Sequence, residues 1–318
     1  MGDYRKMIMD GLREQYSEKE FDIQQVARNN GCSYEGVYEK SNDGKPCGPY
    51  VAIGPFEERL AKGTSDLQTV LKDIIAKLNE RIHFEATDLR DFEKIKDKIF
   101  FRVINYDANR NLFANVPHRE YLDLAVLYQV VVKISGDMQG NIVISNDMLK
   151  AWGITELELY ELAYANSFLP EGLRIRTLEN VVSDMCGGFT EGLDILAEPV
   201  NRTLMYVVDT GTQSFGSAAI LEKESFKKLA DKEGCDLFLI PSSTHEYIIV
   251  PKKGGVLAEK LKEMLWEVNY TVLDPEELLS NHIYQYLREK EEIVDLYEGE
   301  NVDLEMHFSE KKFFLERV

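Results

Sequence analysis

The stretch 235-CDLFLIPSSTHEYIIV-250 decides the fold class of this 318-residue chain. Two apolar runs, 235–240 and 246–250, flank the short polar segment 241–245, whose Pro and Ser residues are turn formers. This pattern predicts an antiparallel hairpin. The helix expected after it carries apolar residues at helical spacing: Leu257, Leu261, Met264, Leu265 and Val268. Hairpins packed against helices are typical of an α+β protein, which is the fold class that we predict.

The same order of strand, turn, strand and helix is predicted twice more upstream. One hairpin joins LAVLYQVVVKI (124–134) to IVISN (142–146), and its strands are too apolar to be exposed on both faces. The other repetition consists of TLMYVVD (203–209), GSAAILE (216–222) and ESFKKLADK (224–232). We therefore expect a main α+β domain of hairpin-plus-helix modules over residues 86–287.

Residues 1–85 are expected to form a smaller unit. Asp3 is suited to cap an amphipathic helix, and a second helix carries an apolar stripe between Leu67 and Leu78. Three short runs lie between these helices, separated by turn-forming Asn, Asp and Gly residues: FDIQQVA (21–27), YEGVYEK (34–40) and GPYVAIG (48–54). The pattern predicts an α-β-β-β-α unit.

The C-terminal part of the chain is rich in acidic residues. Asp274 and Pro275 suit the N-cap and the first position of a helix, which we expect over residues 274–292. Beyond the main domain, residues 288–318 are expected to form an acidic, solvated tail.

Charge limits the classes of partner. The 56 acidic and 37 basic residues give a net charge of -19, which opposes nucleic-acid phosphates and anionic lipid headgroups. We therefore expect neither direct nucleic-acid binding nor membrane binding. Such a charge serves solubility, but it also fits an acidic inhibitor or nucleic-acid mimic acting on a basic enzyme surface. That alternative predicts acidic side chains of helix 274–292 and of the tail on one face, and binding that is lost at high salt.

The cysteines and the hydropathy pattern indicate a cytoplasmic protein. Cys32, Cys47, Cys186 and Cys235 are far apart in the chain and fit neither a disulfide framework nor a zinc knuckle, which predicts reduced thiols. No window approaches the roughly 20 apolar residues of a membrane span, and the charged N-terminus lacks the apolar run of a signal peptide.

Two polar loops at strand ends form the candidate ligand site. Their amide, imidazole, guanidinium and hydroxyl groups suit an anion or a polar ligand. The structural alternative is that Arg119 pairs with Asp123 and that the serine hydroxyls bond to the turn backbone. The candidate residues are Asn105, Tyr106, Asn109, His118, Arg119 and Asp123 in the first loop, and Ser242, Ser243, His245 and Glu246 in the second.

Ser243 and His245 superficially resemble the parts of a hydrolase. A nucleophile elbow places its serine on a strand-to-helix turn within GxSxG, whereas these residues lie in a predicted strand-to-strand turn without flanking glycines. Catalysis would require a bulge or a partner from elsewhere, such as His282. We predict no catalytic residue, and the hydrolase stays an alternative.

Metal and cofactor motifs are absent from the sequence. The five histidines show no HxxxH or HxH spacing, so we predict no metal site. Neither GxGxxG after a strand nor GxxxxGK[ST] occurs, so we predict no cofactor. GGFTEG (187–192) lacks a strand-loop-helix frame and is expected to be a hinge between the halves of the main domain.

Several of these segments together resemble an uncharacterised bacterial domain-of-unknown-function family that is common in anaerobic gut bacteria and their mobile elements. The resemblance spans roughly residues 5–285 and depends chiefly on the motifs NYDxNxxL…VPHRxxLDLA and LPSSxHE, with Ile240 in place of the leucine. The segments 143–166 and 206–230 are also similar to a second uncharacterised cytoplasmic family of Gram-positive bacteria. The resemblance implies an α+β fold and a bacterial cytoplasmic origin, and it implies no activity.

We interpret the chain as a non-enzymatic cytoplasmic binding or regulatory protein of bacterial or mobile-element origin. Its partner would be an unidentified protein, of basic character if the acidic surface is what it recognises. The sequence does not define the oligomeric state. If the two polar loops converge in space they form one site, and if they lie apart each keeps its structural role.

Overall fold

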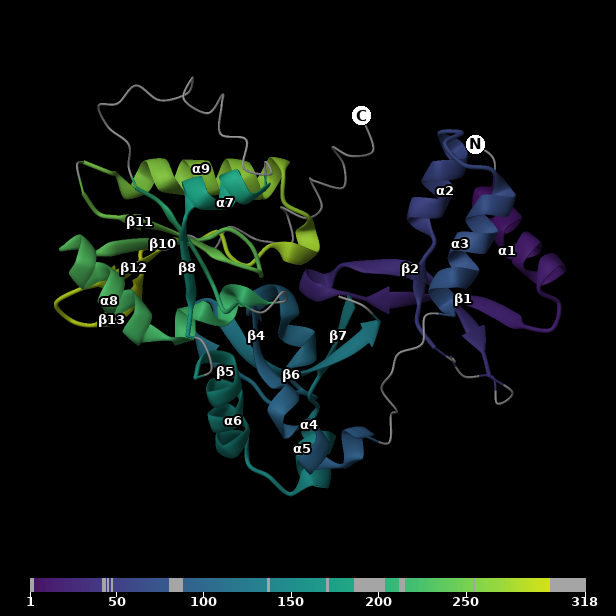
Figure 1. The fold of residues 1–318 in the computed structure, drawn as a ribbon, viewed down its shortest axis with the longest axis horizontal. Coiled ribbons are helices and arrows are strands. Elements are labelled where there is room, and N and C mark those ends of the chain that lie inside the picture. The colour runs from purple at the N-terminus through teal and green to yellow at the C-terminus, as the bar shows by residue number, and fades with distance from the viewer. Residues whose placement is uncertain are drawn as a thin grey trace. The chain divides into compact units, whose positions relative to one another are not determined.

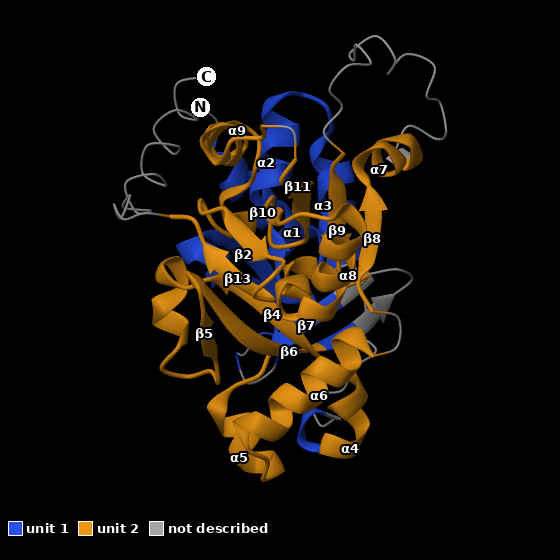
Figure 2. Ribbon diagram, turned by 90° about the vertical axis from the view of Figure 1, so that its left-hand side faces the viewer, with its two compact units in different colours: residues 1–91, 131–142 blue, residues 92–130, 143–318 orange. Residues whose placement is uncertain are grey.

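The computed structural model describes residues 3–41, 44, 46, 48–79, 88–135, 138–169, 172–185, 204–211, 215–253 and 255–297. The chain divides into two compact units (Figure 2): residues 1–91 with 131–142 form unit 1, and residues 92–130 with 143–318 form unit 2. Helices and antiparallel sheets make up the fold, so the α+β class is confirmed. None of the helices in the described segments is long and apolar enough to cross a membrane.

Unit 1 begins with one helix, three strands and two further helices (Figure 1). Its elements are α1 (Tyr4–Gln15), β1 (Glu20–Ala27), η1 (Asn29–Gly31), β2 (Ser33–Lys40), β3 (Val51–Ala52), α2 (Gly54–Ala61), α3 (Leu67–Leu78) and η2 (Asp88–Arg90). The strands pair antiparallel in the order β1-β2-β3. The α-β-β-β-α order is therefore present, with α2 as an addition and with a third strand that is shorter than GPYVAIG predicts.

The helices of unit 1 form because each has a capped start and one apolar face. Asp3 accepts a hydrogen bond from the backbone N–H of Lys6, and Asp66 accepts one from that of Thr69. The apolar faces of α1 and α3 are buried with residues of the sheet in one core, which includes Ile8, Leu12, Val37, Leu71 and Ile74.

Unit 2 contains two antiparallel sheets, one of which continues into unit 1 through residues 131–142. Its elements are α4 (Phe92–Ile95), η3 (Lys96–Lys98), β4 (Ile99–Asn105), η4 (Asp107–Leu112), β5 (Arg119–Tyr121), β6 (Leu124–Ser135), β7 (Met138–Val143), α5 (Asn146–Trp152), α6 (Glu156–Phe168), β8 (Arg174–Thr177), α7 (Leu178–Met185), β9 (Tyr206–Asp209), η6 (Gly216–Leu221), α8 (Lys223–Glu233), β10 (Leu237–Pro241), β11 (Tyr247–Pro251), α9 (Ala258–Thr271), η7 (Pro275–Glu277), β12 (Tyr284–Leu287) and β13 (Glu292–Asp295). The smaller sheet has the order β4-β6-β5, with β7 paired to β6, and the larger has the order β13-β12-β10-β11-β9-β8. The hairpins predicted at 124–146 and 235–250 are thus confirmed as β6–β7 and β10–β11.

The larger sheet is covered on both faces. Helix α9 lies over one face (Figure 1), where its Leu261 packs in a cluster with Phe238 of β10. Neighbouring residues of a strand point to opposite faces, so Leu237 and its register partner Tyr286 lie on the other face. There the ring of Tyr286 contacts Phe226 of α8, with 6.3 Å between centroids. The helical stripe predicted for α9 is only partly buried, since Met264 and Val268 are exposed.

Residues 216–221 form the helix η6, and the strand predicted for GSAAILE is wrong. Gly216 lies so close to the β10–β11 turn that a Cβ atom there would be 2.1 Å from the carbonyl oxygen of His245. The hydroxyl of Ser217 donates a hydrogen bond to the carbonyl of Val103 in β4. The segment is apolar because it is buried between these neighbours, and a short apolar run does not distinguish a strand from a buried helical turn.

The helix predicted over residues 274–292 is also wrong. Only the short η7 forms at its start, and the chain then extends into β12, an inner strand between β10 and β13. Ser280, Ile283, Tyr284 and Tyr286 are fully buried. Such continuous burial does not fit a helix with one apolar face, and the capping residues specify only the first turn.

The predicted tail begins inside the larger sheet. Residues 292–295 form β13, which pairs with β12 and buries Ile293, so the boundary expected after 287 falls within a hairpin. Residues 298–318 and the predicted hinge at 187–192 lie outside the described residues.

Candidate metal centre

Asp123, His282 and Asp295 converge in unit 2. Asp123 follows Leu122 in the tight turn between β5 and β6, where Leu122 has a left-handed φ of 57°. His282 precedes β12, and Asp295 is the last residue of β13, so the β12–β13 pairing brings these two side chains together. One ligand atom from each of the three residues lies within 4.8 Å of the other two.

His282 lies between the two carboxylates. Its Nδ1 atom is 2.7 Å from Oδ2 of Asp295 and 3.7 Å from Oδ2 of Asp123. Its ring stacks on Tyr297, with centroids 4.1 Å apart and an interplanar angle of 5°. The backbone N–H of His282 donates to the hydroxyl of Ser280, which fixes the chain just before the imidazole.

Both carboxylates have further hydrogen-bond partners. Asp123 accepts from the hydroxyl of Ser280 at 2.6 Å and from the phenol of Tyr284 at 2.5 Å. Asp295 accepts from the backbone N–H of Tyr297 at 2.8 Å. Hydrogen bonds of this kind orient the ligands of metal sites, because they fix the carboxylate oxygens before an ion arrives.

Burial and mutual charge set the protonation of the cluster. Burial raises the pKa of Asp123, although the charge of His282 and the hydroxyls of Ser280 and Tyr284 act in the opposite direction. Burial alone would lower the pKa of His282, but the hydrogen bond to Asp295 and the charge of Asp123 outweigh it, so that pKa is raised. These contacts favour the protonated form of the imidazole.

The cluster has the ligand chemistry of a divalent metal site. An ion about 2.0–2.2 Å from imidazole nitrogen and carboxylate oxygen would hold these atoms roughly 3–4 Å apart. The 3.7 Å separation lies in that range, and the 2.7 Å separation, which is that of a hydrogen bond, would have to lengthen slightly. The three side chains are 20–25% exposed, so solvent reaches the cluster and water could complete the coordination. A metal would displace the proton from His282, since metal ligands must be deprotonated.

Asp123 is the one residue of the first predicted loop that joins this cluster. Asn105 accepts a hydrogen bond from the backbone N–H of Ala108 and donates one to the carbonyl of Leu279, and Asn109 donates to the carbonyl of Asn105. The phenol of Tyr106 donates to Glu120. These contacts give the amides of the loop a structural role.

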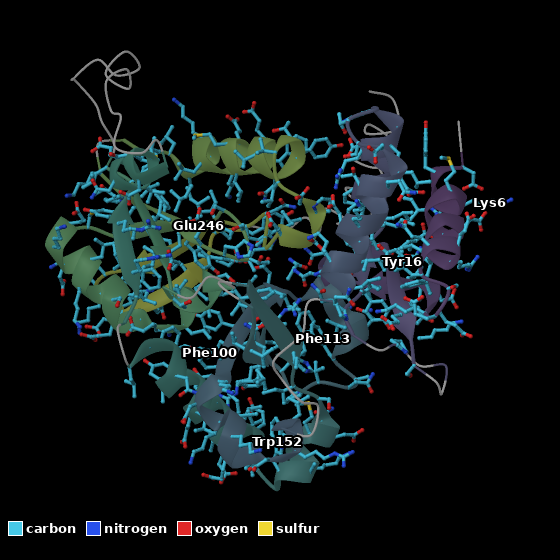
Figure 3. The ribbon with its side chains drawn as sticks, turned by 45° about the vertical axis from the view of Figure 1, so that its right-hand side comes forward. Lys6, Tyr16, Phe100, Phe113, Trp152 and Glu246 are labelled. Atoms are coloured by element: carbon cyan, nitrogen blue, oxygen red, sulfur yellow. The ribbon has the colours of Figure 1, made fainter. Side chains whose placement is uncertain are left out.

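His118 and Arg119 point to other neighbours. The ring of His118 stacks on Phe113, which is labelled in Figure 3, at a centroid distance of 4.4 Å. Arg119 binds both carboxylate oxygens of Glu156, at 2.7 and 2.9 Å, and lies 4.0 Å from the ring centroid of Tyr160. The expected Arg119–Asp123 pair is therefore wrong: Arg119 stabilises the start of α6, and Asp123 binds the segment before β12.

The second loop has the contacts of a turn. Ser242 donates to the backbone carbonyl of Glu246, which is labelled in Figure 3, and Ser243 accepts from the backbone N–H of His245. The imidazole of His245 lies 3.5 Å from the carboxylate of Glu277.

Residues 277–280 connect the two predicted loops. Glu277 accepts a hydrogen bond from the backbone N–H of Thr244 in the second loop, whereas Leu279 and Ser280 bind Asn105 and Asp123 of the first. His282, considered above only as a partner for Ser243, lies instead between Asp123 and Asp295.

The model of a protein family described as "Family of unknown function (DUF5688)" matches residues 2–288. The chain belongs to this family. No curated protein and no solved structure is significantly similar to it. The family match ends before Asp295, so it includes two of the three residues of the cluster.

Proposed function

We propose that this family member is a non-enzymatic regulatory protein of the bacterial cytoplasm that binds one divalent metal ion through Asp123, His282 and Asp295. The observation that carries the proposal is the convergence of an imidazole nitrogen and two carboxylate oxygens within 4.8 Å. The cytoplasmic setting is supported by the free thiols of Cys32 and Cys235.

The ligand set favours a first-row transition metal such as Zn²⁺ or Mn²⁺. Imidazole suits zinc and iron, carboxylates suit manganese, and Mg²⁺ and Ca²⁺ prefer sites made of oxygen alone. Three protein ligands leave coordination positions for water or for a group from a partner.

Metal binding would affect the C-terminal hairpin formed by β12 and β13. Asp123 belongs to the turn before β6 in the smaller sheet, whereas Asp295 ends β13 in the larger sheet, so an ion would tie the two sheets of unit 2 together. Tyr297, which donates to Asp295, is followed directly by residues 298–318, which contain six acidic and three basic residues. In this proposal, metal occupancy would change the hold on Tyr297.

The test uses the full chain after dialysis against EDTA. Titration with Zn²⁺ or Mn²⁺ should give one calorimetric site per chain and raise the Tm, whereas Mg²⁺ and Ca²⁺ should do neither. At an ion concentration 100-fold above Kd the stabilisation is about 2.7 kcal/mol, or roughly 5–10 °C for a unit of this size.

Two variants distinguish metal binding at this cluster from nonspecific cation binding by an acidic protein. Asp295→Asn should remove the calorimetric site, whereas Asp147→Asn, which changes the charge equally at a 91% exposed side chain, should leave it unchanged. Equal binding by both variants, or no binding by the wild type, would show that the cluster is only a charged network.

A further inference from the structure

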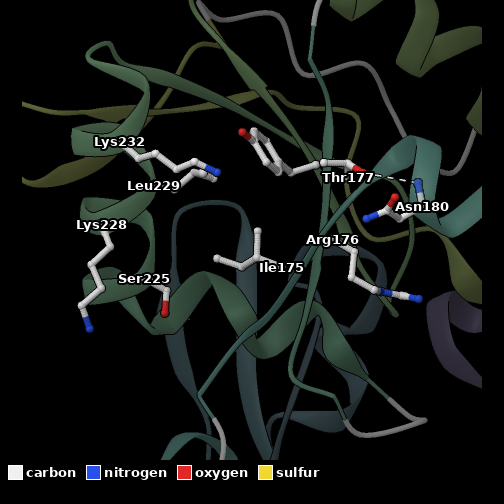
Figure 4. A pocket seen from close by; sticks show the side chains of 9 residues that line it. Ile175, Arg176, Thr177, Asn180, Ser225, Lys228, Leu229 and Lys232 are labelled. Carbon is white, nitrogen blue, oxygen red and sulfur yellow. Dashed lines mark hydrogen bonds between the residues drawn. The ribbon is translucent and has the colours of Figure 1, made fainter.

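A second site lies in unit 2 between α8 and the strands β8 and β9. It is a pocket of about 420 Å³, and its lining side chains are drawn in Figure 4. This volume falls within the roughly 300–1,000 Å³ of small-molecule sites. The pocket has an apolar wall, formed by Ile175, Tyr206 and Leu229, and a polar wall on α8, formed by Ser225, Lys228 and Lys232. Arg176, Thr177 and Asn180 also line it.

The apolar wall is held in place. Tyr206 and Leu229 are buried, and the phenol of Tyr206 donates a 2.6 Å hydrogen bond to Glu233. The other oxygen of Glu233 accepts from Lys253 at 2.9 Å. Burial and the Glu233 carboxylate raise the pKa of Tyr206 to about 12, so the phenol stays protonated and continues to donate. The ring is therefore fixed by the protein and does not depend on a ligand for its position.

The polar wall is cationic in a chain whose net charge is -19. Ser225, Lys228 and Lys232 are three and four residues apart on α8, so they lie on one face of that helix. The ammonium of Lys232 is 5.5 Å from the ring centroid of Tyr206, and among the described residues no carboxylate forms an ion pair with it. Lys228 makes a long, exposed contact of 3.8 Å with Glu224.

We infer that this pocket binds a small phosphate monoester that carries a planar ring. Lys232, whose ammonium points toward the ring of Tyr206 in Figure 4, supplies positive charge for the phosphate, and the hydroxyl of Ser225 supplies a hydrogen-bond donor. Ile175 and Leu229 supply an apolar surface for the ring. A purely apolar ligand would leave the ammonium of Lys232 unpaired beside it, and a bare anion would leave the apolar wall in contact with water. The inference is independent of the metal centre.

The experiment titrates the full chain, in EDTA and at low salt, with phenyl phosphate, inorganic phosphate and phenol. Phenyl phosphate should bind at least tenfold more tightly than either of the other two compounds. Lys232→Ala should weaken this binding at least tenfold, whereas Lys223→Ala, on the same helix but outside the pocket, should change it by less than twofold. Thermal unfolding of both variants verifies that they are folded.

Any of the following outcomes would contradict the inference. Equal affinity for phosphate and phenyl phosphate would show that the apolar wall does not contribute, and equal affinity for phenol would show that Lys232 does not. Absence of phenyl phosphate binding, or binding that is the same in Lys232→Ala, would show that the pocket is not a site for this class of ligand.

Discussion

The imidazole Nδ1 atom of His282 lies 2.7 Å from the Oδ2 atom of Asp295, across the β12–β13 hairpin. The contact joins the residue that precedes one strand to the residue that ends the next, so it closes the open end of the hairpin. Asp123 reaches the same imidazole from the other sheet of unit 2. This arrangement makes the stability of the C-terminal hairpin depend on a residue in the turn between β5 and β6.

Asp123→Asn should destabilise the protein by about 1–3 kcal/mol, even in EDTA. The carboxylate accepts hydrogen bonds from two hydroxyls, of Ser280 and Tyr284, and an amide presents only one acceptor oxygen to them. A buried hydroxyl left without its acceptor has a cost of this order. Urea unfolding measures the effect, and Tyr284→Phe, which removes only one of the two bonds, should cost less. A variant as stable as the wild type would show that the two hydroxyls readily find other acceptors.

Gly216→Ala should be strongly destabilising, by about 3 kcal/mol or more, because the new methyl group would lie 2.1 Å from the carbonyl oxygen of His245. The other close neighbour is the Cβ atom of Asp209, at 2.8 Å, and neither atom is the end of a flexible side chain, so the backbone itself would have to shift. Gly54→Ala is the matched control, since nothing lies within 4 Å of a Cβ there. Similar unfolding midpoints for the two variants would mean that η6 does not pack against the β10–β11 turn as described.

Leu265→Ala should cost about 2–4 kcal/mol, whereas Met264→Ala should cost less than about 0.5 kcal/mol. The two residues are adjacent on α9, but Leu265 is 4% exposed and Met264 is 55% exposed. Chemical unfolding of both variants decides which face of α9 covers the larger sheet. The reverse order of stabilities would contradict the orientation of this helix.

The ion pair of Arg119 and Glu156 should contribute to stability in a pH-dependent way. Burial alone would raise the pKa of Glu156, but the hydrogen bonds from Arg119 and Tyr128 outweigh it and lower the pKa below the ordinary value of 4.5. The unfolded chain therefore takes up the proton at a higher pH than the folded chain does. The stabilisation is present above pH 4.5 and is lost as the pH falls through the folded-state pKa.

Glu156→Gln tests this dependence. At neutral pH the variant should be about 1 kcal/mol less stable than the wild type, a value reduced by solvent screening because both partners are about one-third exposed. This difference should shrink as the pH falls below 4.5. Glu161→Gln, an exposed neighbour on α6, serves as the control. A difference that is constant with pH would show that the carboxylate charge is not what stabilises the contact.

Local sequence patterns predicted the helices and strands in which buried residues recur at one regular spacing. The hairpin at 235–250 and the helix α8 were predicted because turn formers and apolar periodicity are encoded within a few residues. The same reasoning failed at 216–222 and at 274–292. In these two segments the residues are apolar because they are buried on several sides at once. Capping residues indicate only where a helix could begin.

The candidate site was predicted only in part. Asp123 was recognised as a polar residue beside a buried strand, and His282 only as a partner for Ser243. Asp295 was missed because it lies in the stretch expected to be a tail. The signal that could have found it is the short apolar run around Ile293, which completes an edge strand. Metal-ligand motifs consist of ligands a few residues apart on one element, and no two residues of this cluster are that close in the chain.

The sequence by itself determined the α+β class, most of the strands and helices, and the acidic balance that disfavours nucleic acids. These properties depend on composition and on neighbours within a few turns of chain. Only the tertiary structure decided which polar groups meet: Ser280 and its partner Asp123 are 157 residues apart, and His282 and Asp295 are 13 residues apart on different sides of a hairpin. Strand pairing and burial, which act between distant segments, bring these groups together. No local sequence pattern indicates that pairing.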